Sequence, residues 1–342
     1  GLGWGLSAYS LISRCSQTYE QDADAANPNF VPTGVQLDSR DRFCLDGQRL
    51  LLVEGGEYGA NGAVYRKELD DFVRVTSSGS VGDGPTCFTA EAPDGGVVHY
   101  GNCAAAPNST ALILSDLSTG VPYAWAQARM EDLAGNYMNY FYRPPSSGIE
   151  ILLDRIEFTG NINTGHIPYA ALEFDYEFKP VSERTESYIA TKKVVSQRRL
   201  TTIHSTQGTD YLRSYHLTYS ALNDGVGRSI LEAIQECHQP VTAGGICFDQ
   251  TRFTWQRASN ASGITSSAAS FTLADYDHLS TSNSRHQIQT GDFNGDGQDD
   301  LFYVGLSGQL HVALGQGDGS FAALPGVAAM DLNHYMLSDV NS

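Results

Sequence analysis

The fold class of this chain is decided by the stretch Leu172-Glu173-Phe174-Asp175-Tyr176-Glu177-Phe178-Lys179. Apolar and charged residues alternate along it without a break. Successive side chains of a β-strand point to opposite faces, so this pattern gives one buried face and one wet face. The stretch therefore predicts a half-buried strand of an antiparallel sheet.

The segments around it also favour strands. Tyr211–Tyr219 places three tyrosines at even spacing, which predicts that they share one face and stack across strands. Met138–Tyr142 is expected to form another strand, and Pro93-Asp94-Gly95-Gly96 has the composition of a hairpin turn. Ser229–Cys237 fits a short helix or a strand equally well. No segment shows a long apolar period of about 3.6 residues, so we expect an all-β chain.

Length and composition bound the function. The chain has 342 residues, enough for one large or two ordinary domains, and its net charge of −18 argues against nucleic acid or anionic membrane surfaces as partners. No apolar run approaches the roughly 20 residues of a membrane helix. The chain begins at Gly1 without a methionine or a signal peptide, so we expect it to be a fragment.

The candidate metal site lies in the segment Gly291–Asp300, which reads GDFNGDGQDD. Counted from Asp292 as position 1, side-chain oxygens recur at positions 1, 3, 5 and 9, and a glycine stands at position 6. The backbone carbonyl of position 7 can turn inward. Calcium takes about six to eight oxygen ligands in irregular geometry, which suits this loop. The predicted ligands are Asp292, Asn294, Asp296, the Gln298 carbonyl and Asp300.

This loop is not an EF-hand, because position 12 is Tyr303 rather than glutamate and the following residues read as a strand. The alternative is a hairpin turn without an ion. Four carboxylates within nine residues would repel each other without a cation, which favours calcium. Asp299 is expected to point away from the ion, since neighbours in an extended strand face opposite sides.

The loop begins again at Ser338–Ser342, at a spacing of 339 − 292 = 47 residues. That period suits a propeller blade of four short strands. With the intervening segment Leu310–Phe321, the unit resembles the FG-GAP/VCBS repeats of calcium-binding β-propellers. The resemblance implies that residues 286–342 form the truncated start of a propeller, after a small, polar linker at 258–285.

Residues 1–257 carry a second resemblance, to the N-terminal domain of SpvB-type virulence proteins and of the B components of insecticidal Tc toxins. It rests on the order and spacing of several blocks: Gly3-Trp4, Ile12–Cys15, Asp41–Leu50, Tyr65–Glu68, Trp125, Asp132–Tyr137, Ile234–Cys237, Cys247 and Phe253–Trp255. In that family a calcium-type propeller repeat follows, as it does here.

The resemblance implies a non-enzymatic module of a secreted bacterial toxin or RHS-type protein. In Tc toxins this domain helps to build a hollow β-shell around a toxic C-terminal segment, and the propeller closes the shell and docks on the translocation subunit. The implied partners are therefore other toxin-complex subunits and downstream RHS and toxin segments. The alternative is an extracellular, calcium-dependent adhesion or carbohydrate-binding propeller protein.

We find no catalytic motif: no G-x-S-x-G elbow, H-E-x-x-H, phosphate loop or dinucleotide fingerprint, and no E-x-E pair. We expect His204 and His216 to be structural residues in strands. Arg14, Asp41 and Arg42 could form a polar cluster, for which buried or turn-bracing ion pairs are the preferred interpretation.

Six cysteines are present, with no C-x-x-C pair to indicate zinc or redox chemistry. An even number in an exported chain permits disulfides, and buried free thiols are the alternative. Cys237 and Cys247, which flank a short loop, are the first candidates for a bridge, and Cys15 and Cys44 are the second.

Overall fold

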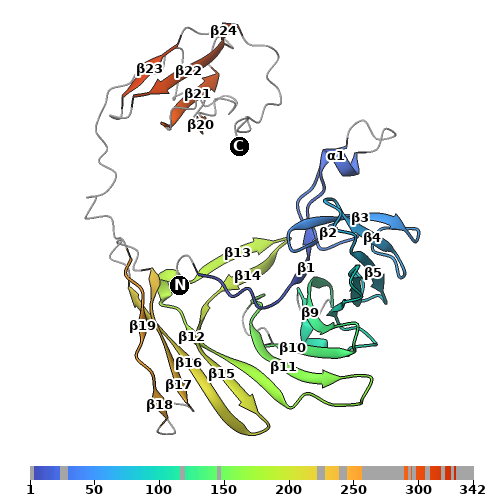
Figure 1. Ribbon diagram of the computed structural model, residues 1–342. Coiled ribbons are helices and arrows are strands. Elements are labelled where there is room, and N and C mark those ends of the chain that lie inside the picture. The colour runs from blue at the N-terminus through green and yellow to red at the C-terminus, as the bar shows by residue number, and fades with distance from the viewer. Residues whose placement is uncertain are drawn as a thin grey trace. The chain divides into compact units, whose positions relative to one another are not determined.

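The computed structural model divides the chain into two compact units, Gly1–Trp255 and Gln256–Ser342 (Figure 1). The first is described for residues 4–23, 30–115, 120–144, 148–221, 228–238 and 245–255. The second is described for residues 289–291, 294, 298–304, 309–316, 320–324 and 327–328. The predicted linker at 258–285 lies outside the described residues.

The first unit begins with a closed barrel. Its pairings run in the order β1–β2–β3–β4–β5–β6–β7–β9 and return to β1, all antiparallel. These strands are β1 (Leu11–Cys15), β2 (Arg42–Leu45), β3 (Gln48–Glu54), β4 (Val64–Lys67), β5 (Arg74–Ser78), β6 (Cys87–Glu91), β7 (Val97–Gly101) and β9 (Pro122–Glu131). Helix α1 (Tyr19–Asp22), the 3-10 turn η1 (Ser109–Ala111) and strand β8 (Leu112–Leu114) fill the connections.

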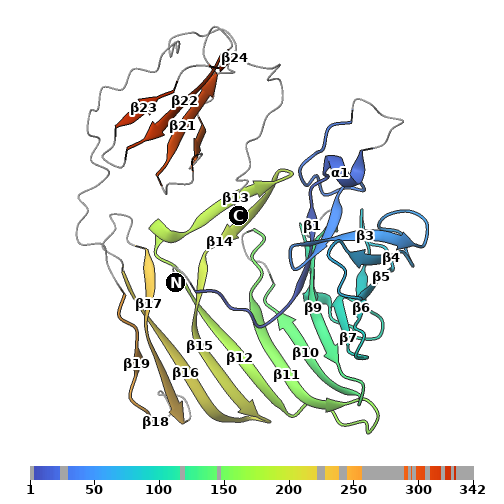
Figure 2. The same cartoon turned by 45° about the horizontal axis from the view of Figure 1, so that its top comes forward.

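From β9 the sheet continues as an open, curved layer in the order β10–β11–β12–β15–β16–β17 (Figure 2). Its strands are β10 (Asn136–Tyr142), β11 (Leu153–Asn161), β12 (Ala170–Phe178), β15 (Arg198–Gln207), β16 (Asp210–Ala221) and β17 (Ser229–His238). The edge carries β18 (Ile246–Cys247) and β19 (Thr251–Arg252). In the chain, η2 (Val181–Glu183) and a separate hairpin of β13 (Thr185–Ile189) and β14 (Lys192–Ser196) lie between β12 and β15, which pair directly with each other in the layer.

Strand β9 joins the two halves because its two faces enter different cores. Trp125 points into the barrel, where it packs in a fully buried aromatic cluster with Phe43 and Phe88. Ala124 and Ala126, one residue to either side, belong to the second core on the curved layer. The period of two that defines a strand thus lets one element support both cores.

The alternation predicted for Leu172–Lys179 is confirmed in β12 from Leu172 to Glu177, and it ends at Phe178, which is exposed. Leu172, Phe174 and Tyr176 pack into the second core, whereas the acidic residues that alternate with them contact side chains of other strands. Their partners come from the neighbouring strands: Glu173 with Arg155, Asp175 with His204 and Glu177 with Arg199.

The structure decides one open alternative and corrects one prediction. Ser229–His238 is a strand, not a helix. The tyrosines of β16 do not share one face: Tyr211 contacts the His204 ring at 5.2 Å, whereas Tyr219 lies on the opposite, hollow face. The cause is one irregularity in register: Ser205 and Thr206 of β15 pair with Arg213 and Tyr211, so Leu212 is an extra residue in β16 and reverses its faces there.

Helices are short throughout the described ranges, and none of them is long and apolar enough to cross a membrane. The all-β, antiparallel class predicted from the sequence is therefore confirmed.

The second unit contains one antiparallel sheet. It comprises β20 (Gln289–Gly291), β21 (Asp300–Val304), β22 (Gln309–Gly315), β23 (Phe321–Ala323) and β24 (Val327–Ala328). A small sheet of this kind is the unit of a propeller blade. The propeller itself stays a prediction.

All six cysteines are paired. The predicted bridges Cys237–Cys247 and Cys15–Cys44 are both present, and a third, Cys87–Cys103, was not predicted. The third pair could not be found by spacing because its partners meet only through the pairing of β6 with the segment after β7.

We expect unreduced, denatured protein to expose no reactive thiol, and replacing Cys237 and Cys247 by serine to lower the free energy of unfolding by about 2–3 kcal/mol. A short loop gives a modest gain in chain entropy. Thiol labelling followed by mass spectrometry measures the first quantity and urea unfolding the second. Six labelled cysteines in the unreduced protein would contradict the bridges.

Candidate functional site

The hollow face of the curved layer holds a pocket of about 830 Å³. Its floor is aliphatic and comes from four strands of the layer. The floor residues are Leu153 of β11, Leu200 and Ile203 of β15, Leu217 of β16, and Leu231 and Ile234 of β17. This volume lies within the range of small-molecule sites.

Two segments wall the pocket. One is the N-terminal strap, residues 4–10, which leads into β1; Trp4 and Tyr9 line the pocket from it. The strap is fixed at both ends by aromatic contacts: Trp4 lies 5.2 Å from Phe253, and Tyr9 lies 5.5 Å from Tyr142. The other is the β13–β14 hairpin, which contributes Thr185, Val195 and Ser196.

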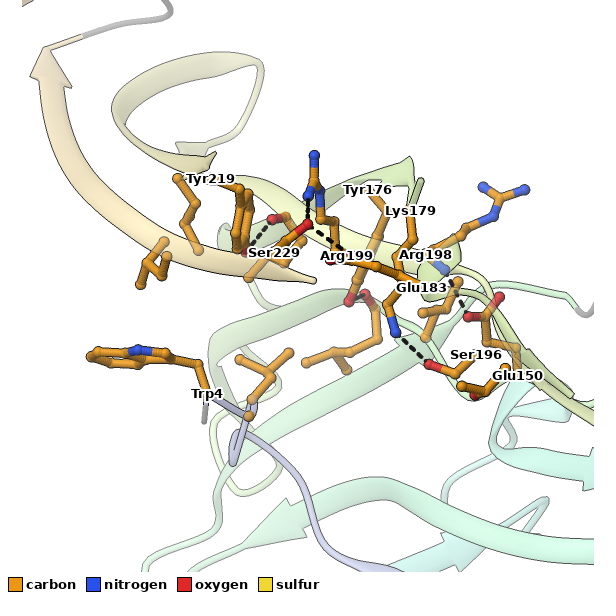
Figure 3. A pocket seen from close by; sticks show the side chains of 18 of the residues that line it. Trp4, Glu150, Tyr176, Lys179, Glu183, Ser196, Arg198, Arg199, Tyr219 and Ser229 are labelled. Atoms are coloured by element: carbon orange, nitrogen blue, oxygen red, sulfur yellow. Dashed lines mark hydrogen bonds between the residues drawn. The ribbon is translucent and has the colours of Figure 1, made fainter. Parts of the chain in front are cut away.

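Polar groups cluster at one end of the pocket (Figure 3). Arg199 connects Glu177 with Ser229, and the Ser229 hydroxyl donates to Glu183 Oε2 at 2.8 Å. Glu183 Oε1 is buried and has no hydrogen-bond partner in the described part of the chain. The Lys179 ammonium points into the pocket and donates to Ser196 Oγ at 2.6 Å.

The sequence analysis did not predict this pocket. Alternation along Leu172–Lys179 places Tyr176 on an apolar face, and Tyr176 does line the pocket. The curvature of the layer and the return of the strap across it cannot be predicted from any local sequence pattern.

The predicted polar cluster near the N-terminus is a buried structural pair. Arg14 and Asp41 lie 3.1 Å apart with side chains 1% exposed. Asp41 also accepts from the backbone N–H groups of Gln36 and Leu37, at 2.7 and 2.8 Å. Arg42 does not join this pair; it binds Asp22 of α1 at 2.6 Å. This cluster braces the turn before β2, as preferred from the sequence.

The predicted structural histidines occupy the outer face of the layer. His204 Nε2 lies 2.9 Å from Asp175, and His216 Nε2 lies 2.9 Å from the Ser214 hydroxyl. Burial lowers the pKa of His216, and the neighbouring His204 lowers it further. Nothing in the described ranges groups three or more His, Cys, Asp or Glu side chains in an arrangement that could hold a metal ion.

The predicted calcium ligands are described only in part. Asp292 and Asp296 lie outside the described residues. Asn294 and Gln298 are exposed, and Asp300 is fully buried at the start of β21. The Gly315 N–H donates to Asp300 Oδ1 at 2.8 Å.

Asp300 is the buried member of the predicted ligand set. A carboxylate buried at this depth needs donors or a cation to offset its desolvation, and the Gly315 N–H supplies one donor. Asp299, its neighbour, is exposed, in agreement with the expectation that the two point to opposite sides.

A family model described as an FG-GAP-like repeat matches residues 292–336. No curated protein matches the chain.

Among solved structures, the chain is similar to TcdB2-TccC3 without its hypervariable C-terminal region, with a TM-score of 0.55, 14% identity, and 93% of this chain and 17% of that one covered. It is also similar to a Photorhabdus luminescens Tc holotoxin pore, with a TM-score of 0.54 and 14% identity; the match covers 93% of this chain and 17% of that one. The match to the N-terminal domain of the effector SpvB from Salmonella typhimurium strain LT2 has a TM-score of only 0.42 and 13% identity; it covers 73% of this chain and 88% of that one.

The chain thus spans about a sixth of the length of the Tc toxin chains that it matches. At this level of identity the likeness concerns the fold. The resemblance inferred from the sequence is confirmed at that level: the chain has a fold found in Tc toxin components, followed by an FG-GAP-like repeat.

Proposed function

We propose that this chain is a structural module of a secreted bacterial toxin complex, in which the curved layer forms part of the wall of a hollow shell. The observation that carries the proposal is the curved layer itself, whose two faces differ in chemistry. The floor of its hollow face is aliphatic, and its outer face carries the polar contacts Arg155–Glu173 and His204–Asp175. A shell wall that contacts water on its outer face and apolar chain segments on its inner face needs one polar and one apolar face.

The barrel suits the same role. A closed ring of strands has no free edge for unwanted pairing, so it offers a rigid corner from which the layer extends. In the proposed assembly the partners are downstream segments of the same toxin and the translocation component. The proposed role requires no catalytic group in this chain.

The experiment uses two single cysteines in the full-length protein, Ile203→Cys on the hollow face and its neighbour Thr202→Cys on the outer face. The native cysteines are paired and do not react. A maleimide polymer too large to enter a shell should label Thr202→Cys and spare Ile203→Cys. With the strap deleted from both proteins, so that it does not shield position 203, the full-length protein should still spare Ile203→Cys, whereas the 342-residue chain should react at both positions. Equal labelling of both positions in the full-length protein would contradict the proposed wall.

We also propose that the Gly291–Asp300 loop binds calcium, with Asp292, Asn294, Asp296, the Gln298 carbonyl and Asp300 as ligands. The donor chemistry supports this assignment, because all five groups offer oxygen and the sequence places a glycine at the sixth position of the loop, counted from Asp292. The ion would neutralise carboxylates that otherwise repel, and so hold the loop against the sheet of β20–β24.

Asp296→Ala should abolish the calcium-dependent rise in melting temperature, whereas Asp299→Ala should leave it. Calcium that binds only the folded state stabilises it by about 2.7 kcal/mol at a hundredfold excess over Kd. Differential scanning calorimetry with calcium and with chelator, on a protein with the complete repeat array, measures the effect. An unchanged melting temperature on chelation would mean that the loop is a turn without a metal.

A further inference from the structure

The pocket differs in charge from the rest of the protein. Its lining carries four cations and two carboxylates, a formal balance of +2, in a chain whose net charge is −18. The cations are Lys179, Arg198, Arg199 and Arg228, and the carboxylates are Glu150 and Glu183. A cationic pocket in an acidic protein attracts anionic ligands by local charge, against the overall field.

One of these cations is free to bind a ligand. Lys179 donates to the neutral Ser196 hydroxyl and forms no ion pair with any carboxylate of the described residues. Arg199, in contrast, is already paired with Glu177. The two carboxylates of the lining are engaged as well: Glu150 accepts from the N–H groups of Gln197 and Arg198, and Glu183 accepts from Ser229.

The floor beside Lys179 can make only apolar contacts. Its side chains are Leu153, Leu200, Ile203, Leu217, Leu231 and Ile234. A flexible hydrocarbon chain needs no hydrogen-bond partner along its length and gains from each methylene that it buries on such a floor.

From these observations we propose that the pocket binds a single-chain fatty acid. Its carboxylate accepts a charge-assisted hydrogen bond from Lys179, and its alkyl chain lies on the aliphatic floor under the strap. The strap completes the site because the indole of Trp4 and the ring of Tyr9 wall the side that faces away from the layer. This site does not depend on the shell function proposed above.

Calorimetric titration of the 342-residue chain with laurate, below its micelle concentration, tests the proposal. We expect one bound laurate, and affinities lower by roughly tenfold or more for dodecyltrimethylammonium, which has the same chain length and the opposite charge. Acetate, the head without the chain, should not bind measurably.

The matched variants are Lys179→Met, which keeps the length of the side chain, and Lys67→Met on β4, a lysine paired with Asp71 at 2.7 Å in the barrel. We expect Lys179→Met to weaken laurate binding roughly tenfold or more and Lys67→Met to leave it unchanged. Leu217→Trp places a bulky indole on the floor of the pocket and should weaken laurate binding.

Absence of laurate binding, equal affinity for the two amphiphiles, or an unchanged affinity in Lys179→Met each overturns the proposal. If Lys179→Met does not fold, the comparison of laurate with dodecyltrimethylammonium on the unmodified chain, together with Leu217→Trp, still decides it.

Discussion

Trp125→Ala is expected to lower the free energy of unfolding of the first unit by about 3–5 kcal/mol, the range for removing a large aromatic side chain from a core. Trp125 is fully buried at the centre of the barrel. Its ring lies 5.1 Å from Phe43 and 5.0 Å from Phe88 in edge-to-face contacts, and its Nε1–H donates to the Pro85 carbonyl at 2.8 Å.

The loss should be large because β9 is the strand that both closes the barrel and begins the curved layer. A cavity beneath it therefore disturbs both halves. Trp4→Ala is the control: Trp4 is 47% exposed, and its removal should cost less than about 1 kcal/mol. Urea unfolding followed by far-ultraviolet circular dichroism compares the two, and equal shifts of the midpoint would contradict the central role of Trp125.

Asp41→Ala is expected to destabilise the protein by about 3–5 kcal/mol, because it leaves the Arg14 guanidinium buried without its counter-charge. It also removes the acceptor of the Gln36 and Leu37 N–H groups. Burial lowers the pKa of Arg14, and Asp41 opposes that effect by attraction and by its hydrogen bond. Arg14 stays protonated, so the charge cannot be relieved at ordinary pH.

A double-mutant cycle with Arg14→Met separates the pair from its surroundings. We expect the double variant to be less destabilised than the sum of the two single variants, since the unpaired charge is then gone. Arg40→Ala is the exposed control, because its partner Asp38 lies at the surface and such pairs contribute about 0–1 kcal/mol. Additive losses in the cycle would show that the two side chains are not coupled.

The strands could be predicted from the sequence because their signal is local. Alternation in Leu172–Lys179 places each side chain by the geometry of one strand, and the paired faces of β12 agree with it. The same holds for the opposite exposure of Asp299 and Asp300. The bridge between Cys237 and Cys247 could be predicted from the sequence because the two residues flank one short loop.

The predictions fail where strand pairing departs from the regular alternation of side chains. Tyr211 and Tyr219 are eight residues apart and should share a face, yet irregular register in β16 separates them. A shift of one residue reverses every later side chain, and nothing in the spacing of tyrosines announces it. The bridge Cys87–Cys103 was missed for a related reason, since its partners meet only after β6 and β7 have paired.

By itself the sequence determined the all-β class, two of three disulfides and the resemblance to Tc toxin components, whereas the calcium site stays a prediction. Each of these depends on residues close together in the chain or on the order of short blocks. Only the tertiary structure decided that eight strands close a ring, that the layer beyond them curves, and that the strap returns across it. Contacts such as Trp4 with Phe253 join residues about 250 positions apart. They make the pocket, and no local pattern of charge or polarity contains them.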